Sequence, residues 1–200
     1  MRCHKPDFPN RDFPIEHAVD AESPEFPHSL TDYLTGREIP FSNRDTIRQK
    51  ILRFLIEEKG YLKDDISTDR EIRFDIEGTE TSSMVDISIR LDNKTLIVGK
   101  CSSGSLVSRE RQIIAAARLL ENYLVPFAVV TNGKDLELLD SDSGRVIGEG
   151  FGSLPSRQDL LEICRGFSFK PTNKKKIIYE QRILFTYDAI GCPVNCKVDP

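Results

Sequence analysis

The segments MVDISIRL at residues 84–91 and TLIVGKC at residues 95–101 have the composition of two consecutive β-strands. In the first, apolar residues alternate with polar ones, which is typical of a strand with one buried and one solvated face. A Ser/Gly-rich link then leads into SRERQIIAAARLLENY at residues 108–123, whose apolar residues recur at helical spacing. We therefore expect two neighbouring strands and a helix, with Asp86 on the first strand and Lys100 on the second.

Asp86 and Lys100 are the candidate catalytic residues of this segment. Because side chains alternate along a strand, Lys100 and position 98 are expected on one face, facing the same way as Asp86. A metal-dependent phosphodiesterase uses such an arrangement, since carboxylates hold a Mg²⁺ ion that activates water and a lysine stabilises developing negative charge. The second carboxylate of such a site would stand at position 98, which Val98 occupies. The segment thus predicts a phosphodiesterase site with one acid missing.

Apolar patterning predicts further elements on both sides of this segment. FAVVT at residues 127–131 is a continuous apolar run closed by Asn-Gly, as in a buried central strand. With the strand and helix that precede it, this run forms a right-handed strand–helix–strand unit. The remaining elements are expected as a helical turn at 29–34, helices at 44–59, 156–165 and 173–189, and strands at 71–76, 136–139 and 146–147. The fold class is therefore α/β, with a mixed central sheet flanked by helices.

Bulk properties favour one soluble domain with appended ends. The 200 residues are 38% hydrophobic and 30% charged, with a formal net charge of −4 and no run of 18 or more apolar residues. The N-terminus lacks an apolar signal, so we expect a cytoplasmic protein that does not associate with membranes. We divide the chain into an extended proline-rich arm at 1–28, an α/β domain at 29–165 and a C-terminal helix and tail at 166–200.

The five cysteines do not predict a disulfide framework, because they are odd in number, widely spread and accompanied by no export signal. Cys192 and Cys196 are close enough to bind zinc together, and Cys3 and His4 would complete a four-ligand site. Reduced thiols near a chain end are the alternative interpretation. The sequence contains neither a P-loop nor a GxGxxG motif, which gives no support to nucleotide hydrolysis or dinucleotide binding.

Taken together, these segments resemble the PD-(D/E)XK nuclease superfamily, and more closely the N-terminal nuclease domain of the R subunits of type I restriction enzymes. The resemblance covers about residues 30–160. It is carried by these stretches: IRQKILRFLIEEKGY (47–61), VDISIRL (85–91), NKTLIVGKC (93–101), SRERQIIAAARLL (108–120) and PFAVVTNGKDLELLD (126–140). It implies a restriction-endonuclease-like core, DNA as a partner and a Mg²⁺-dependent endonuclease activity. A catalytically inactive DNA- or protein-binding module of the same fold is the alternative.

The resemblance assigns the metal-binding aspartate of this family to Asp86. If Lys100 is the lysine of the family's E-x-K element, Val98 stands in the position of the acid. A shift of the alignment by one residue puts Gly99 in the acid position and Cys101 in the lysine position. Both alignments therefore lack the acid, and the second lacks the lysine as well.

The two helices around these strands carry the remaining candidate site residues. Glu110 is available as a replacement acid, and we expect it to bind the metal with the strand aspartate and to act in catalysis. On the first helix, Asp45 lies near the position where the family often places a further acid. Arg109 and Arg111, together with Lys100, are expected to contact DNA phosphates, whereas solvated intrahelical ion pairs are the alternative for the two arginines.

The C-terminal helix is expected to begin near KKK at residues 174–176. Three cations at a helix N-terminus oppose the helix dipole. Either the helix begins later than this run, or a partner holds the lysines. We therefore also expect a protein partner that binds through this helix.

Overall fold

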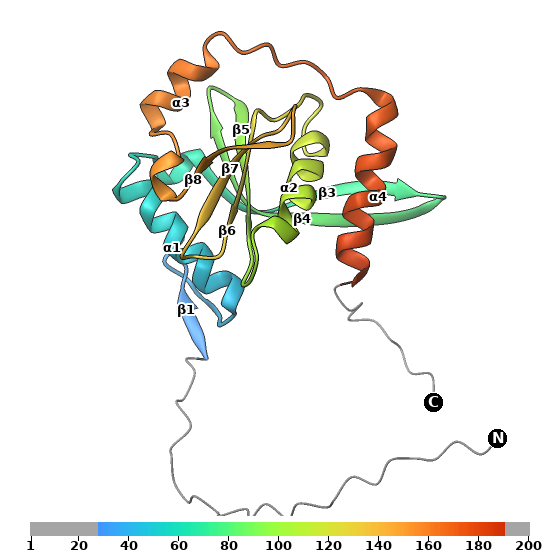
Figure 1. Cartoon of the computed structure of the whole chain (residues 1–200). Helices are drawn as coiled ribbons and strands as arrows, with labels where there is room; N and C mark the ends of the chain where they lie inside the picture. Colours follow the sequence, from blue (N-terminus) through green and yellow to red (C-terminus); the bar gives the residue numbers. More distant parts are fainter. Residues whose placement is uncertain (1–27, 191–200) are drawn as a thin grey trace, which may run out of the picture.

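The structure, a computed structural model, describes residues 28–190 as a six-stranded mixed sheet with helices packed against it (Figure 1). The strands of this sheet lie side by side in chain order: β3 (Ile66–Ile76), β4 (Thr79–Leu91), β5 (Lys94–Cys101), β6 (Phe127–Thr131), β7 (Leu136–Asp140) and β8 (Arg145–Glu149). A separate two-stranded sheet pairs β1 (Ser29–Thr31) with β2 (Glu38–Pro40). The helices are α1 (Asn43–Glu57), α2 (Val107–Leu119), α3 (Arg157–Cys164) and α4 (Lys174–Ile190). The expected α/β class with a mixed central sheet is confirmed.

Residues 1–27 and 191–200 lie outside the described part of the chain. The proline-rich arm expected at 1–28 falls almost wholly there. The zinc hypothesis rests on residues that also lie outside the described residues: Cys3, His4, Cys192 and Cys196. Within the described range, no helix combines the length and the apolar character needed to cross a membrane.

The predicted strand–helix–strand unit forms the centre of the sheet. β5 and β6 are parallel neighbours, and α2 connects them. The other neighbouring strands of this sheet are antiparallel. Because β5 and β6 are parallel, their last residues, Cys101 and Thr131, lie opposite each other. We call this side of the sheet the carboxyl edge.

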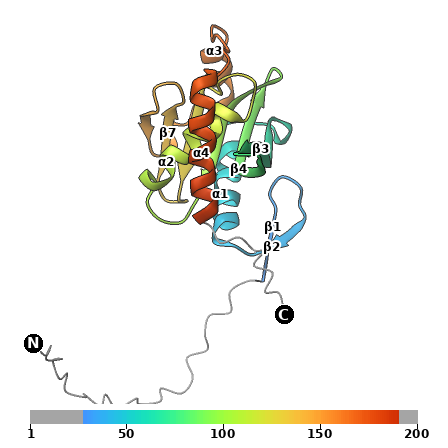
Figure 2. The ribbon, with the colours of Figure 1, turned by 90° about the vertical axis from the view of Figure 1, so that its right-hand side faces the viewer.

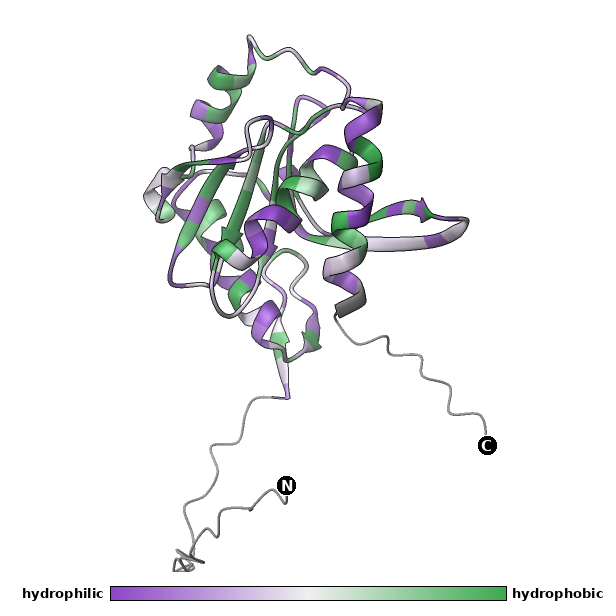
Figure 3. Ribbon diagram, turned by 45° about the vertical axis from the view of Figure 1, so that its right-hand side comes forward, coloured by the Kyte–Doolittle hydropathy of each residue, from purple (hydrophilic) through white to green (hydrophobic). Residues whose placement is uncertain are grey.

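Helices cover both faces of the sheet, which gives three layers (Figures 1 and 2). α1 packs Leu52 and Leu55 on one face, against strand residues that include Ile87. α2 and α4 pack Ile113 and Leu184 into a second core on the opposite face. Figure 3 shows hydrophobic residues concentrated along the central strands, between these helices. Since burial of one such side chain contributes about 1.5–3 kcal/mol, the two cores together hold the layers in place.

The start and end of α1 follow from local sequence chemistry. The Ser42 Oγ caps the helix by accepting a hydrogen bond from the Asp45 backbone N–H at 3.0 Å. Gly60, with φ of +73°, reverses the chain just after the helix, as glycine does without steric cost. The predicted helix at 44–59 is confirmed with slightly different bounds. Its first turn points toward the carboxyl edge, where the candidate site lies, because Ile47 lies beside the turn that follows β6.

β3 and β4 form a long hairpin that projects beyond the other strands (Figure 1). β4 has 13 residues, but its pairing with β5 begins at Ile87, so residues 79–85 pair with β3 alone. α4 lies over the projecting part, where Phe74 and Val85 share the second core with Leu184 of the helix. The site residue Asp86 therefore stands where β4 leaves the main sheet.

Three details of the predicted elements are wrong. Residues 29–34 contain β1 and a turn rather than a helical turn, because this short segment pairs with β2. Two of the three residues expected on the solvated face of β4 are buried, since helices cover both faces of the sheet and leave Asp86 and Ser88 only 0% and 1% exposed, whereas Arg90 is exposed as expected. α2 ends before Tyr123, whose hydroxyl instead accepts the Thr95 backbone N–H at 2.7 Å and ties the chain back to the sheet.

Candidate functional site

Asp86 and Lys100 lie opposite each other on β4 and β5. The antiparallel register pairs Ile87 with Gly99, which places Asp86 across from Lys100. The Lys100 Nζ donates a hydrogen bond to Asp86 Oδ1 at 3.3 Å and another to the Met84 carbonyl oxygen at 3.2 Å. The structure thus brings together, near the carboxyl edge, the two residues that the sequence singled out.

Asp86 is completely buried, and both oxygens of its carboxylate are engaged. The Oδ2 atom accepts the backbone N–H of Cys101 at 2.7 Å. The Oδ1 atom accepts Arg44 Nη1 at 3.5 Å as well as Lys100, and the Asp86 side chain is 0% exposed. Burial of a carboxylate without partners is very costly, so these three donors are what makes its position tolerable.

Asp86 belongs to a wider network of ion pairs, which we call the Asp86 cluster. It joins α1, β3, β4 and β5 through three carboxylates and three cations: Asp45, Asp69 and Asp86, and Arg44, Arg48 and Lys100. Arg48, 6% exposed, donates to Asp45 Oδ1 at 2.7 Å and to Asp69 Oδ2 at 2.5 Å. Arg44 lies 3.3 Å from Asp45 and 3.5 Å from each of the other two carboxylates. Formal charges therefore balance within the cluster.

The cluster also sets the electrostatics of its neighbours. Burial lowers the pKa of the Arg44 guanidinium, but Asp86, Asp45 and Asp69 outweigh this effect and raise the pKa above its usual value. Burial raises the pKa of the Cys101 thiol, and the negative charge of Asp86 raises it further. A thiol that is 2% exposed and resists ionisation is not a nucleophile, so Cys101 has a packing role.

Sequence reasoning missed Arg44, Arg48 and Asp69 as members of the site. The spacing of the two arginines was a usable signal, because residues four apart at the start of α1 share one helix face. No sequence signal marks Asp69, which has a φ of +51° in the middle of β3. A left-handed conformation is uncommon for a residue other than glycine. Here the ion pair with Arg48 accompanies that strained backbone.

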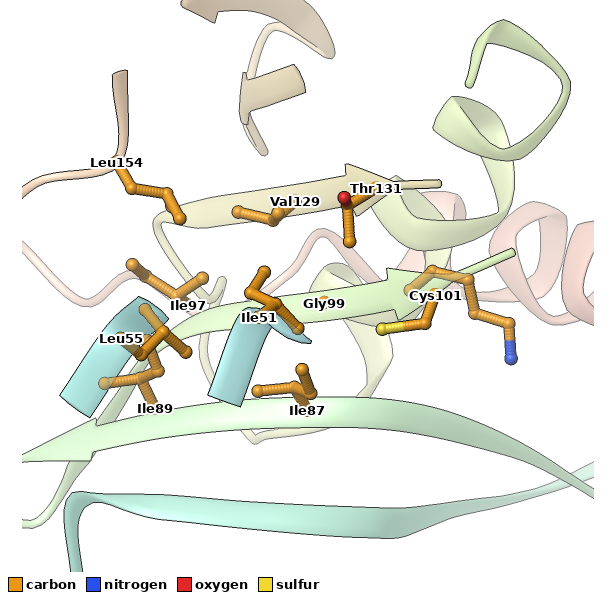
Figure 4. Close-up of a pocket in the computed structure, with 11 residues that line it drawn as sticks. Ile51, Leu55, Ile87, Ile89, Ile97, Gly99, Cys101, Val129, Thr131 and Leu154 are labelled. Carbon is orange, nitrogen blue, oxygen red and sulfur yellow. The ribbon is translucent and has the colours of Figure 1, made fainter. Parts of the chain in front are cut away.

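Neither alignment of the E-x-K element supplies a carboxylate. Val98 is 0% exposed and packs in the core beneath α2, on the opposite face of the sheet from α1. Gly99 and Cys101 border the other core, where they line a cavity of about 10 Å³ with mostly apolar walls, Ile51 and Ile87 among them (Figure 4). A carboxylate at position 98 or 99 would therefore enter an apolar core rather than a solvated site.

Glu110 lies in the first turn of α2 beside Glu137 of β7. Burial raises the pKa of Glu137, and the adjacent carboxylates of Glu110 and Glu149 raise it further. Among the described residues, no three His, Cys, Asp or Glu side chains are grouped so that they could hold a metal ion. The contacts of Glu110 are thus with β7 and not with the strand aspartate, and its catalytic and metal-binding roles stay predictions.

The three cations expected to contact DNA all make contacts within the protein. Lys100 holds Asp86, and Arg109 Nη1 donates to a neighbouring glutamine at 3.3 Å. Arg111 Nη2 donates to Glu180 Oε2 on α4 at 2.6 Å, and Glu180 is 2% exposed. Arg111 therefore helps to dock α4 on α2, and DNA contact by these three residues stays a prediction.

Comparison with protein families assigns most of the described domain to a family. Residues 43–155 match the family described as type I restriction enzyme R protein N terminus. The chain belongs to this family. The matched range begins at the first residue of α1, includes all strands of the main sheet and contains every member of the Asp86 cluster. Comparisons with curated proteins and with solved structures gave no match.

The sequence led us to expect Mg²⁺ at Asp86, but the donors present do not fit this ion. Magnesium requires carboxylate and water oxygens in a near-octahedral arrangement and retains several waters. The two Asp86 oxygens already face Lys100, Arg44 and the Cys101 N–H, and the side chain has no solvent exposure. Binding of Mg²⁺ stays a prediction that a measurement has to test.

Proposed function

We propose that this chain is a nuclease-like module that interacts with DNA and does not cleave it by metal-dependent catalysis. One observation carries the proposal: both oxygens of the buried Asp86 carboxylate already accept hydrogen bonds, from Lys100, Arg44 and the Cys101 N–H. A catalytic metal ligand needs oxygen atoms free for the ion, with water beside it. The position of a second acid is filled by Val98 within the core.

The free energy of the Asp86 contacts also opposes metal binding. To accept a divalent ion, Asp86 would have to give up buried contacts with two cations, and breaking a buried pair typically costs about 3–5 kcal/mol. The incoming ion would also meet the positive charges of Arg44 and Lys100 at short range. The same contacts have a structural role, because they hold α1 against the strands.

A cleavage assay tests the absence of catalysis. The full chain and the variant Asp86→Asn are incubated with supercoiled plasmid and with linear duplex, in Mg²⁺ and in Mn²⁺. Asn keeps the size of the side chain and its acceptor for the Cys101 N–H, so the variant isolates the charge. We expect no conversion of either substrate by either protein. Cleavage by the natural chain that disappears in Asp86→Asn would overturn the proposal.

DNA contact is proposed at the carboxyl edge. Arg109 in the first turn of α2 is partly exposed, and Lys134 in the turn after β6 is exposed. The Asn132 side chain donates to the Gly104 carbonyl oxygen at 3.3 Å, which holds the two loops of this edge together. Membership in a restriction enzyme family supports DNA as the partner.

Binding of a fluorescent duplex, followed by anisotropy over a salt series, tests this contact. Each phosphate contact that is lost reduces the slope of log K against log salt by about 0.9. We expect the double variant Arg109→Ala/Lys134→Ala to bind about tenfold more weakly, with a slope lower by roughly two. The matched control is Lys50→Ala/Arg53→Ala, which removes two exposed charges from the outer side of α1. Equal slopes for both variants would reject the carboxyl edge as the DNA site.

A protein-binding module of the same fold is the second candidate, and the outer face of α4 favours it. Ile178, Tyr179 and Phe185 are 55%, 66% and 41% exposed there. Contiguous exposed apolar side chains are typical of protein contacts. Sedimentation equilibrium of the full chain tests self-association first. Concentration-dependent dimers that disappear in Ile178→Ser/Phe185→Ser would support this candidate, and a monomer at all concentrations would reject a second copy as the partner.

A further inference from the structure

A groove of about 360 Å³ lies between the end of α2, the turn after β7 and the segment that leads into α4. Its lining includes Arg118, Leu124, Asp142, Lys170, Asn173 and Lys176. It lies at the opposite end of the sheet from the carboxyl edge, because Leu124 precedes the first residue of β6. Figure 1 shows the segment between α3 and α4 passing over this end of the molecule. The groove is thus separate from the Asp86 cluster.

Two lysines of the groove carry charges that nothing in the described residues offsets. Lys170 and Lys176 are exposed and take part in no side-chain hydrogen bond or ion pair within residues 28–190. Among the described lining residues, Asp142 is the one acid. The groove therefore carries a net positive charge that is available to a ligand.

Arg118 lines the groove and is held in place by several hydrogen bonds. Its guanidinium donates to the Ser141 and Asp142 carbonyl oxygens at 2.9 and 2.8 Å and to Glu180 Oε1 at 2.7 Å. The Thr172 hydroxyl donates to the Arg118 carbonyl oxygen at 2.7 Å, which ties the segment before α4 to the end of α2. Lys170 and Lys176 thus lie on either side of a residue that is tied to α2.

The first turn of α4 also carries uncompensated positive charge. The helix begins at Lys174, so the lysine run at 174–176 lies in its first turn, and that turn contains no acid. The Asn173 side chain caps the helix by accepting the Lys175 backbone N–H at 2.9 Å. Cations at a helix N-terminus oppose the positive end of the dipole. An anion held in the groove would reverse this unfavourable arrangement, because it would attract the dipole and the lysines together.

We propose that this groove binds the phosphodiester backbone of a nucleic acid, with Lys170 and Lys176 each contacting a phosphate. The Phe167 ring also lines the groove and gives a sugar or base an apolar surface beside the lysines. Recognition is independent of base sequence, since lysines contact phosphates as point charges. The inference does not depend on whether the Asp86 cluster is catalytic.

Anisotropy of a labelled 20-nucleotide DNA, single-stranded or duplex, over a salt series tests the groove. The full chain is compared with Lys170→Ala/Lys176→Ala and with the matched control Lys50→Ala/Arg53→Ala. We expect the groove variant to bind about tenfold more weakly and to lose roughly two units of salt slope, while the control keeps both values. Thermal melting of each variant verifies the fold, which these exposed positions should leave intact.

The outcomes separate this groove from the carboxyl edge. Loss of binding in Lys170→Ala/Lys176→Ala with full binding by Arg109→Ala/Lys134→Ala supports the groove and rejects the edge. An unchanged salt slope in the groove variant overturns the inference. Failure of the natural chain to bind either form of DNA also overturns it, and removes DNA from the proposed function while the absence of cleavage stands on its own assay.

Discussion

The Asp86 cluster and the groove before α4 use charged residues in opposite ways. In the cluster, each of three cations faces a carboxylate at 3.5 Å or less, and Asp86 itself is completely buried. In the groove, Lys170 and Lys176 are exposed and have no partner among the described residues. Paired charges in the interior hold elements together, whereas unpaired charges at the surface remain available for a ligand. Their pairing, more than their number, distinguishes a structural joint from a binding surface.

Removing the centre of the cluster should have the largest effect. We expect Asp86→Ala to lower the free energy of unfolding by about 3–5 kcal/mol, because Arg44 and Lys100 would lose a buried partner. Urea denaturation followed by circular dichroism gives this value. A residue kept only for catalysis behaves differently, since its loss often leaves stability unchanged or improved. A variant as stable as the natural chain would therefore contradict the structural role assigned to Asp86.

Glu180 provides a second buried joint, this time between helices. It accepts Arg111 at 2.6 Å and Arg118 at 2.7 Å and is 2% exposed. We expect Glu180→Ala to cost about 2–4 kcal/mol and to loosen α4 from α2, because the largely buried Arg118 and the half-exposed Arg111 lose their shared partner. Hydrogen exchange should show the loss of protection concentrated in α4. Uniform loss across the sheet would instead mean that α4 and the sheet unfold as one unit.

Much of the fold could be predicted because local patterns determine it. The strand at 127–131 was predicted with its observed bounds, since a short apolar run closed by Asn-Gly allows few alternatives. The helix after Ser42 was predicted to within two residues from its cap and its apolar stripe. The adjacency of Asp86 and Lys100 followed from strand order and the two-residue repeat.

What could not be predicted depends on contacts between distant segments. The alternation in β4 indicated a solvated face, but helices packed on both faces of the sheet bury Asp86 and Ser88. Asp69 pairs with Arg48 while its backbone is in the left-handed region, and no sequence pattern predicts that conformation. Arg44 and Arg48 become partners of Asp86 and Asp69 only because α1 begins beside the carboxyl edge. The roles of Glu110, Arg109 and Arg111 stay predictions.

A smaller effect on stability, which depends on pH, is expected at Glu137. Burial and the carboxylates of Glu110 and Glu149 raise its pKa, so the folded protein binds this proton more tightly than the unfolded chain does. A raised pKa contributes stability below the ordinary carboxyl range, and this contribution is lost as pH rises through the folded value. We therefore expect Glu137→Gln to melt a degree or two higher than the natural chain at pH 7 (~0.5 kcal/mol), with little difference near pH 4. A lower melting temperature at pH 7 would contradict the repulsion inferred from Glu110.

The smallest effect is expected where charges are unpaired. Lys170→Ala/Lys176→Ala should change the free energy of unfolding by no more than about 0.5 kcal/mol, because neither side chain has a partner to lose. In low salt the double variant should be slightly more stable than the natural chain. Removal of Lys176 reduces the repulsion between the positive end of the helix dipole and the lysines in the first turn of α4. Urea denaturation in low and high salt measures it, and screening should abolish the gain. A loss as large as that of Asp86→Ala would mean that the lysines are paired after all, and the groove could not then be free for phosphates.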